Sequence, residues 1–484
     1  MDATGLLDSS ALNRRYWLFA CSVAAAAAFE YFDLFLVGYV VSLLAPQWNL
    51  TFGQSSIILM SSGVGALLGA VLAGMATNRF GRKPVLLASL IICSVATCSM
   101  AAVPTGAWLT LSALRFVVGA AVPALHLTVI TLVVELTPTS RRTSLSSLMA
   151  IAMVPIGGLL AALAGANSSI LGWQGLCLLG GIAVIFAPVL WFTVPESPQW
   201  LVSRNRISEA EAVLARFTGS PVRLTVAPIK LVEPADNFWS ALAGNPARTC
   251  LIIFSWFGIS TVSYGMVLWG PTLVRLVLNT TPSQAASLFV AVGFGGLTGR
   301  ILASLIAGRL GRRLTGAMFA GCSALALIAT SIFYDSSSGG FAVFLPMFVV
   351  AYALSDGGWA NAGPMPSELF PTSLRSQAGA LSQFINALGK MVGPMILGVV
   401  AGTGDLVTPK ATLDALQPAF LTLAVFSGVV SCTFLLAGIE THGVSLSTLD
   451  EPGGGTADPS INGRAHAHCP EPAGMMSMRR PTHI

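Results

Sequence analysis

Long apolar runs alternate with short polar segments along most of the 484-residue chain. A membrane-spanning helix needs about 20 mostly apolar residues. Six runs of that length cover residues 17–44, 56–77, 85–103, 108–134, 145–166 and 173–194, and six more cover 249–271, 284–307, 314–334, 340–363, 376–401 and 418–439. This pattern predicts an all-α polytopic membrane protein with twelve transmembrane helices in two pseudo-symmetric six-helix bundles.

The polar segments outside these runs divide the chain into five parts. We expect a cytoplasmic N-terminus (1–16), an N-terminal bundle (17–194), a cytoplasmic linker (195–247), a C-terminal bundle (248–440) and a cytoplasmic tail (441–484). The tail is rich in Gly, Pro and His, a composition that cannot bury enough apolar surface to fold, so it is predicted to be disordered.

Composition and charge support this assignment. The chain is 54% hydrophobic and 9% charged, whereas soluble domains carry about 25% charged residues. With both termini placed in the cytoplasm, 20 of the 25 Lys and Arg residues fall in cytoplasmic segments, and only Arg275 and Lys410 fall outside. Cytoplasmic loops of membrane proteins are enriched in Lys and Arg. The net charge of +5 therefore indicates a plasma (inner) membrane protein surrounded by lipid, without a nucleic-acid partner.

Enzyme and metal chemistry find no support in the sequence. The eight cysteines are scattered and form no CxxC pair, so neither a zinc site nor a disulfide framework is predicted. There is no nucleotide-binding loop and no nucleophile–base motif. We therefore expect no metal, no cofactor and no enzymatic activity.

An internal repeat relates the two bundles. A shift of 230 residues places Gly65, Gly69 and Ala73 on Gly295, Gly299 and Ala303. Small residues at four-residue spacing let membrane helices approach closely. A shift of 233 residues places the segment 135–142 on the segment 368–375. Transporters built from such repeats bind their substrate near the bilayer midplane, between the repeats.

Several motifs resemble those of the major facilitator superfamily. Residues 74–83 (GMATNRFGRK) resemble its signature loop, and Arg115-Phe116-x-x-Gly119 resembles its helix-four motif. Residues 195–201 (PESPQWL) and 440–443 (ETHG) are similar to the sugar-porter branch, whereas 30–34 (EYFDL) resembles the paired-acid motif of metabolite–proton symporters, including aromatic-acid symporters. The resemblance implies the twelve-helix fold of that superfamily and secondary active transport.

The resemblance also implies a cytoplasmic gate of charged residues that holds one conformation closed. Its members here are Asn78, Arg79, Arg82, Glu135, Arg142, Arg309, Arg312, Glu368 and Arg375. The family carries an aspartate where this chain has Asn78, and the repeated loop has Gly308 there, so gating is expected to differ. The alternative is that these basic loops only fix the orientation of the chain in the membrane.

Two acids in the first span are candidates for proton coupling. Ionisable groups cost at least about 2.5–3.5 kcal/mol at the centre of a span, so each needs a reason. Glu30 and Asp33 are three residues apart on one helix face, and two neighbouring carboxyls in a low-dielectric site favour a retained proton on one of them. The alternative is a fixed ion pair with Arg115. The second repeat has Ser260 and Ser263 at these positions, which favours a coupling role.

Helix four adds two more candidates to the proton-coupling set. Arg115 and His126 are eleven residues apart, so at about 100° per residue they return to the same helix face. They could form a line toward the acids of the first span, with the arginine tuning their charge. For His126, a hydrogen-bonded packing role is the alternative.

Candidate substrate ligands lie in the second half of the chain. Arg300, Asp356 and Lys390 fall within spans. Either Asp356 pairs with one of the cations, or one cation stays available for an anionic substrate, since arginine binds carboxylates through two donors; we rank Lys390 below Arg300. Other polar and aromatic candidates for the pocket are Tyr264, Trp269, Trp359, Gln383 and Asn386. Trp269 has an interfacial anchor as its alternative.

The leading hypothesis is proton-coupled uptake of a small organic acid, aromatic or otherwise carboxylic, by a monomer that alternates access to a midplane site. The proton gradient would supply the driving force. Transport of sugars or polyols, and drug efflux, are alternatives within the transporters. A non-transporting membrane sensor is the alternative from a different class.

Overall fold

A computed structural model describes residues 13–224, 242–244, 246–335, 337–338, 341–370 and 375–438, without the side chains of residues 139–152, 337–338, 341–342, 367 and 375–376. The tail predicted at 441–484, most of the predicted N-terminal segment and part of the predicted linker lie outside the described residues. The predictions for Arg142 and Arg375 also concern side chains outside this description.

The N-terminal half consists of six helical spans. They are α2 (Arg14–Gln47), α3 (Phe52–Phe80), α4 (Arg82–Met100), α5 (Trp108–Leu136), α6 (Thr139–Ala166), and a last span formed by α7 (Ser168–Gly181), a 3-10 turn η1 (Ile182–Ile185) and α8 (Phe186–Thr193). Two short helices follow at one end of the bundle, α9 (Pro198–Ser203) and α10 (Ile207–Thr218).

The C-terminal half repeats the arrangement. Its six spans are α12 (Pro246–Val277), α13 (Pro282–Leu310), α14 (Arg312–Phe333), α15 (Phe344–Ala362), α17 (Arg375–Val400) and α18 (Pro409–Ala437), with a short helix α16 (Met365–Leu369) before α17. One small hairpin departs from the helical pattern: strands β1 (Ser337–Ser338) and β2 (Phe341–Ala342) pair antiparallel.

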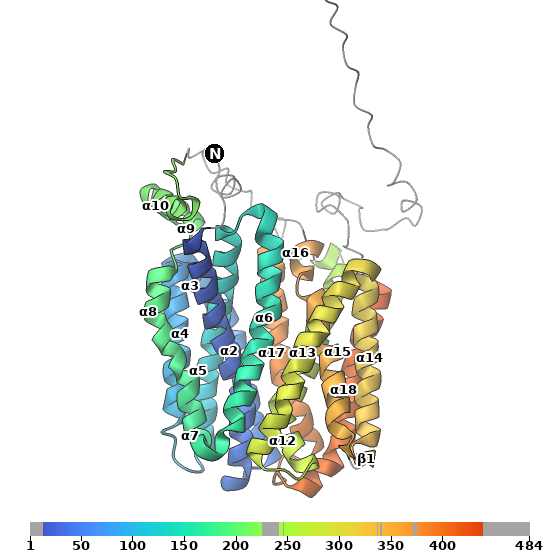
Figure 1. Cartoon of the computed structure of the whole chain (residues 1–484). Coiled ribbons are helices and arrows are strands. Elements are labelled where there is room, and N and C mark those ends of the chain that lie inside the picture. Colours follow the sequence, from blue (N-terminus) through green and yellow to red (C-terminus); the bar gives the residue numbers. More distant parts are fainter. Residues whose placement is uncertain are drawn as a thin grey trace, which may run out of the picture.

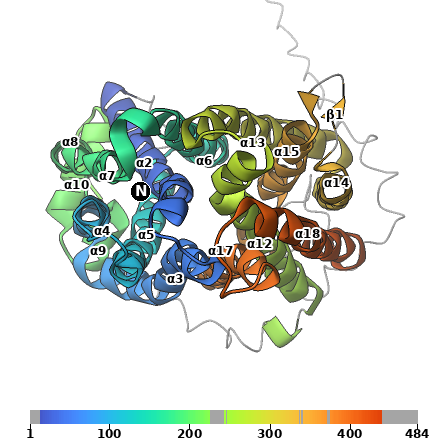
Figure 2. The same cartoon turned by 90° about the horizontal axis from the view of Figure 1, so that it is seen from below.

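The predicted twelve-span architecture is confirmed. Among the described residues, ten helices are long and apolar enough to cross a membrane. The apolar part of α6 contributes a shorter stretch, Met153–Ala166. The remaining span, α15, has 19 residues and carries Asp356 and Asn361, which lower its hydropathy. Figures 1 and 2 show the two halves side by side, with α2, α3 and α6 facing α12, α13 and α17.

The repeated glycines pack equivalent helices together. A Cβ atom at Gly65 or Gly69 of α3 would collide with backbone carbonyls of α5, and one at Gly299 of α13 would collide with the Ala353 carbonyl of α15. Each half therefore brings its second and fourth spans into backbone contact, as the small-residue spacing predicts.

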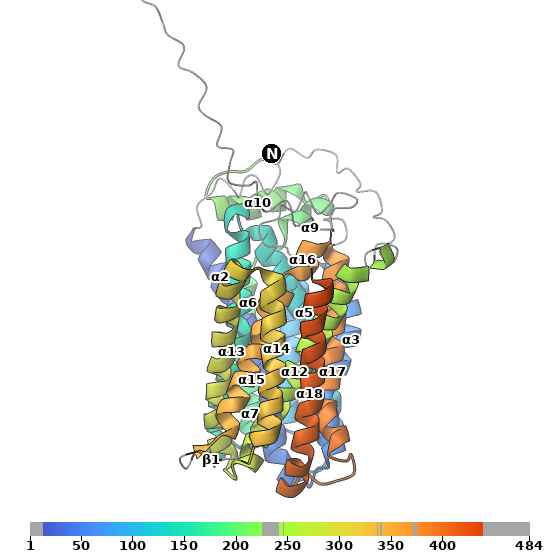
Figure 3. The ribbon, with the colours of Figure 1, turned by 90° about the vertical axis from the view of Figure 1, so that its right-hand side faces the viewer.

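The two ends of the molecule differ, and we name them by what they carry. The linker face carries α9, α10 and the start of α2, and the loop face is the opposite end (Figures 1 and 3). At the linker face, Asn13 Nδ2 donates to the carbonyl of Phe217 in α10 at 2.7 Å. The Phe217 ring packs edge-on against Phe19 at 5.9 Å. Helix α10 is thereby fixed to the N-terminal half.

Hydrogen bonds between the two halves gather at the loop face. We call one set the loop-face bridge, because the loop after α2 and the loop after α17 pair there through their backbones. It contains Phe52 N–H to Asp405 O at 2.9 Å, Gly53 N–H to Thr403 O at 3.1 Å and Val407 N–H to Leu50 O at 3.2 Å, around an antiparallel bridge of Thr51 with Leu406. In addition, Ser283 Oγ donates to the Ala166 carbonyl, and Arg275 Nη1 donates to the Ser42 carbonyl. The halves are held together at this end.

Candidate functional site

Ionisable side chains from five helices lie near the middle of the spans. The N-terminal half supplies them from α2 and α5, and the C-terminal half from α13, α15 and α17. They are Glu30, Asp33, Arg115, His126, Arg300, Asp356 and Lys390. All except His126 have 8% or less of their surface exposed, so their partners decide what each can do.

Asp33 and Arg115 form an ion pair within the N-terminal half, in which Nε and Nη2 of Arg115 have no hydrogen-bond partner among the described residues. Arg115 Nη1 lies 3.0 Å from Asp33 Oδ2, and Thr97 Oγ1 donates to Asp33 Oδ1 at 2.8 Å. Both carboxylate oxygens are therefore occupied, and Arg115 is fully buried. This geometry corresponds to the fixed pair that stood as the alternative for Asp33, so the structure argues against Asp33 as an exchangeable proton site and against an arginine that tunes both acids.

Arg300 and Asp356 form a second buried ion pair, within the C-terminal half. Arg300 Nε contacts Asp356 Oδ2 at 2.6 Å and Nη2 contacts Oδ1 at 2.9 Å. Two parallel charge-assisted bonds of this kind are the strongest arrangement of these groups. The ranking of Arg300 as the available cation is therefore wrong, and the pairing that the sequence left open is the one formed.

Glu30 lacks such a partner. It is 7% exposed, and its Oε2 atom has no hydrogen-bond partner among the described residues. The charges of Lys390, from the other half, and of Asp33, on its own helix, act on it. A buried carboxyl without a bonded cation is costly as an anion, which distinguishes Glu30 from the ion-paired Asp33 and Asp356.

Lys390 is the corresponding cation on the other side of the interface. In the described part of the chain its ammonium group makes no ion pair and no hydrogen bond. Its Nζ lies 5.0 Å from the centre of the Tyr264 ring, within cation–π range. A Cβ atom at Gly63 of α3 would lie 3.0 Å from the Lys390 carbonyl carbon. The glycine lets α17 approach the N-terminal half and brings Lys390 to the interface.

Polar and aromatic candidates surround this pair. Asn386 Oδ1 accepts from Ser260 Oγ at 2.8 Å, and Asn386 Nδ2 lies 3.4 Å from Gln383 Oε1. His126 packs edge-on against Tyr31, with 6.3 Å between ring centres, and the charge of Lys390 acts on it. Asn386 and Gln383 lie on α17 together with Lys390, whereas His126 and Tyr31 belong to the N-terminal half.

The two tryptophans have other roles. Trp269 is 1% exposed, donates through Nε1 to the Pro394 carbonyl at 2.8 Å and packs against Phe52 at 5.8 Å. It therefore lies in the buried contact between the two halves near the loop face. It is neither beside Lys390 nor at the lipid interface. Trp359 packs edge-on against Trp256 at 5.1 Å. It therefore belongs to the packing of the C-terminal half, near the linker-face end of α15.

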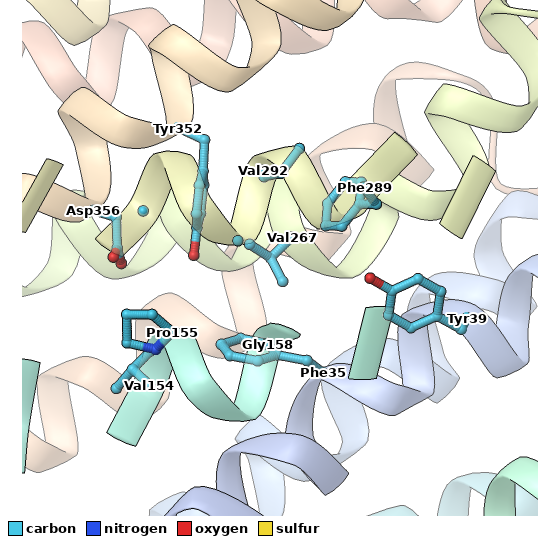
Figure 4. Close-up of a pocket in the computed structure, with 12 residues that line it drawn as sticks. Phe35, Tyr39, Val154, Pro155, Gly158, Val267, Phe289, Val292, Tyr352 and Asp356 are labelled. Carbon is cyan, nitrogen blue, oxygen red and sulfur yellow. The ribbon is translucent and has the colours of Figure 1, made fainter. Parts of the chain in front are cut away.

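A narrow pocket opens between the halves next to this group (Figure 4). Helices α2 and α6 line one side and α12, α13 and α15 line the other. Its residues are Phe35, Tyr39, Val154, Pro155, Gly158, Val267, Phe289, Val292, Gly293, Gly296, Tyr352 and Asp356. Figure 4 shows the side chains of Tyr352 and Asp356 extending toward Val154 and Pro155.

Sequence reasoning missed the tyrosines of this pocket. A signal was present for Tyr352, which precedes Asp356 by four residues and therefore lies on the same helix face. Tyr39 gave no such signal, because its neighbourhood on α2 is uniformly apolar.

Part of the predicted gate forms ion pairs within each half. Arg312 Nη2 lies 2.7 Å from Glu368 Oε1. Arg82 Nη2 lies 3.9 Å from Glu135 Oε1, and Glu135 also accepts from Ser197 Oγ. Each of these ion pairs joins helix ends of the same half at the linker face. Each pair therefore stabilises its own half and does not connect the two halves.

Three further gate candidates lie at the surface. Asn78, Arg79 and Arg309 are exposed. At Asn78 it is the backbone carbonyl that is bound, by Trp200 Nε1 at 3.0 Å and Arg204 Nη2 at 2.8 Å. The linker therefore holds the end of α3 without the family's aspartate.

Glu196 belongs to the PESPQWL motif, but the sequence analysis did not name it as a site residue. Its Oε1 atom accepts from the backbone N–H groups of Arg82 at 2.7 Å and Lys83 at 3.3 Å. A carboxylate at the N-terminus of a helix satisfies free amide groups and the helix dipole. Glu196 thus ties the linker to the start of α4.

Comparisons with known proteins agree with this architecture. The sequence profile described as Major Facilitator Superfamily matches residues 23–394. The niacin transporter NiaP of Acinetobacter baylyi is 26% identical over 458 residues, covering 93% of this chain and 100% of that protein. The 4-hydroxybenzoate transporter PcaK of Pseudomonas aeruginosa is 26% identical, covering 91% and 97%. Among solved structures, an inward open conformation of the xylose transporter XylE from E. coli superposes with a TM-score of 0.66 at 20% identity, covering 90% and 99%.

Proposed function

Because the chain belongs to the Major Facilitator Superfamily, whose members are transporters and not enzymes, we propose that it takes up a small organic acid together with protons. The acid is a carboxylate, with an aromatic ring as the first choice. The relatives named above carry niacin and 4-hydroxybenzoate, and both of these solutes combine one ring with one carboxyl group.

The observation that carries the proposal is the state of Lys390. It is 8% exposed, it lies at the interface of the two halves, and no anion among the described residues neutralises it directly. A buried cation without a bonded anion is expensive unless it serves a ligand. The ring of Tyr264 lies against the ammonium group of Lys390. Together with the rings of Tyr31 and His126 in the N-terminal half, it provides flat apolar surfaces for an aromatic solute.

Glu30 supplies the proton coupling in this proposal. The charge of Lys390, in the other half, acts on it, and one of its oxygens has no partner among the described residues. When a substrate carboxylate binds Lys390, its negative charge disfavours an anionic Glu30, which therefore carries a proton together with the substrate. In this proposal the proton gradient drives accumulation of the acid, and no cofactor is required.

Alternating access would come from rocking of the two halves about this site. The positive-inside distribution makes the linker face cytoplasmic, in the plasma (inner) membrane. The loop-face bridge is then a contact of the inward-facing conformation, and it must open to admit substrate from outside. A monomer suffices, because both sides of the site come from one chain.

Flux measurements on purified protein in liposomes test the proposal. The liposomes contain a pH dye, and nicotinate, 4-hydroxybenzoate, an aliphatic acid, a sugar and a cationic drug are added outside in turn. We expect internal acidification with an aromatic acid. Silence with every acid, together with flux of a sugar or a drug, would reject the proposal, and silence with all solutes would favour a sensor.

Two variants with matched controls assign the roles. Lys390→Gln is expected to raise KM for the acid by about tenfold or more, since a hydrogen bond to a charged group contributes roughly 1.5–3 kcal/mol. Glu30→Gln is expected to lose pH-driven accumulation but to keep exchange of internal for external acid. Lys410→Gln and Glu209→Gln make the same changes at exposed positions and should transport normally. Pronounced accumulation by Glu30→Gln under a pH gradient would remove Glu30 from the mechanism.

A further inference from the structure

The last turn of α12 carries a buried cation close to the loop face. Of the two basic residues that the sequence places on this side, Lys410 is exposed, whereas Arg275 is only 8% exposed. Under the 230-residue shift Arg275 corresponds to Ala45, so the repeated packing of the two halves does not require a guanidinium here. A buried cation is costly unless its bonds and charge are satisfied, so the surroundings of Arg275 indicate its purpose.

Arg275 bonds to a backbone carbonyl of the other half instead of an acid. Its Nη1 atom donates to the Ser42 carbonyl of α2, and Arg275 makes no ion pair with any residue that the structure describes. This carbonyl is available because Pro46, four residues further along α2, has no N–H to donate to it. The neutral carbonyl satisfies one hydrogen bond but leaves the charge of Arg275 unbalanced.

Two hydroxyl groups without partners lie at the same level. Gly38 of α2 packs directly on α12, since a Cβ atom at Gly38 would lie 2.7 Å from the Leu268 carbonyl oxygen. Both helices run toward the loop face, so one turn further along Ser42 meets Thr272. Ser42 is 2% exposed and Thr272 is 0% exposed, and neither hydroxyl has a hydrogen-bond partner among the described residues. Thr272 also lies three residues before Arg275, on the same helix face.

The groups gathered here are hydrogen-bond donors beside an unbalanced positive charge. Thr272 and Arg275 present a hydroxyl and a guanidinium from one face of α12, a combination that suits a carboxylate. A hydrogen bond between a guanidinium and a carboxylate is roughly twice as strong as one between neutral groups, so a carboxylate that reaches Arg275 displaces the Ser42 carbonyl. While the loop-face bridge is closed, α2 covers Arg275 and keeps solutes away from it.

Taking the substrate class from the function proposed above, we propose that Thr272 and Arg275 form an entry site that binds the carboxylate of the incoming acid once the loop face opens. Opening moves α2 away from α12, and the carboxylate takes the place of the Ser42 carbonyl. Closing returns that carbonyl to Arg275 and releases the acid toward the interior. The entry site is separate from Lys390, because Tyr264, beside Lys390, precedes Arg275 by eleven residues, or about 16 Å along the helix.

Chemical modification of arginine in the full-length protein in detergent tests whether the site opens with the loop face. Phenylglyoxal reacts with accessible guanidinium groups, and mass spectrometry of the peptides gives the rate at Arg275 relative to the exposed Arg79. The variant Gly53→Ala opens the loop-face bridge, because its side chain would collide with Thr403. We expect Arg275 to react at least about fivefold faster in this variant than in the wild type. Equal rates would overturn the link between the site and the loop face.

Protection by added solutes identifies the ligand. These measurements use Gly53→Ala combined with Lys390→Gln, so that binding beside Lys390 is weakened. At about ten times its Kd, 4-hydroxybenzoate should slow the reaction of Arg275 about tenfold and leave that of Arg79 unchanged. The neutral analogue 4-hydroxybenzamide should not protect Arg275. Equal protection by the amide or by chloride, or no protection by the acid, would overturn the assignment of a carboxylate site.

Two hydroxyl deletions form a matched pair. Thr272→Val removes a donor that stays beside Arg275 when the loop face opens, so it should weaken protection about tenfold. Ser42→Ala removes the hydroxyl that moves away with α2, so protection should not change. Equal effects of the two variants would refute the site.

Flux and protection together separate this inference from the proposed function. If the wild type transports acids but Arg275 is not protected, the entry site fails and the proposed function stands. Protection of Arg275 without flux of any acid would reject the proposed function and keep a carboxylate site at Arg275.

Discussion

The loop-face bridge depends on one glycine, and its substitution makes a quantitative prediction. A Cβ atom at Gly53 would lie 2.7 Å from the Thr403 carbonyl oxygen and 3.2 Å from its Cβ. Alanine at this position therefore pushes the two loops apart and breaks the Gly53 N–H bond to Thr403, which is 3.1 Å long. Since this bond exists only while the loop face is closed, Gly53→Ala should shift the molecule toward the conformation that is open at the loop face.

The size of the shift follows from the bonds at stake. One backbone hydrogen bond contributes a net of about 0.5–1.5 kcal/mol, and 1 kcal/mol corresponds to about a fivefold change in the ratio of the two conformations. If the neighbouring bonds of Phe52 and Val407 break as well, the change reaches roughly 3 kcal/mol, or about a hundredfold. We expect a value between these limits.

Distances between spin labels measure this ratio directly. Labels at the exposed residues Gln47 and Gln417, in a background without the native cysteines, report the separation of the two halves at the loop face. The population with the longer distance should rise at least about fivefold in Gly53→Ala. Gly404→Ala is the matched control in the same bridge, because a Cβ atom there meets nothing within 4 Å. An unchanged distribution in Gly53→Ala, or an equal shift in Gly404→Ala, would refute the role of the bridge.

Two further predictions concern stability and are checked by thermal unfolding in detergent. Asp356→Asn leaves Arg300 buried without its anion and should cost about 3–5 kcal/mol, whereas Asp414→Asn at an exposed position should change stability by less than about 0.5 kcal/mol; equal melting temperatures would contradict the bidentate pair. Glu196→Gln weakens the acceptor for the first amide groups of α4 and should cost about 1 kcal/mol, and no loss would mean that the contact does not stabilise the linker.

Comparison of the two repeats shows which positions are shared between the halves and which differ. Glycines that bring α3 onto α5 and α13 onto α15 are shared, because close backbone contact is needed in both halves. The acids of α2 are not shared, and the equivalent serines of α12 hydrogen-bond to Asn386 and Ser355 instead. The symmetric positions therefore build the frame, and the asymmetric ones are the residues to which we assign the proton and the substrate charge in the proposed function.

The sequence by itself determined the twelve spans, their division into two halves and the set of ionisable groups at mid-depth. Apolar length and four-residue glycine spacing are local properties, and burying an uninterrupted apolar run in lipid requires a helix whatever the rest of the chain does. The candidate site residues could be named for the same reason, since any charge inside a span is exceptional.

The tertiary structure decided which of these charges are paired. Asp33 and Arg115 are 82 residues apart, and Arg300 and Asp356 are 56 apart; nothing in the local pattern distinguishes these partners from Glu30 or Lys390. The same holds for the loop-face bridge, which is made of backbone groups that every residue possesses. Pairing depends on how helices distant in sequence meet, because a buried charge is neutralised only by a group within a few ångströms, and that distance is set when the two bundles pack.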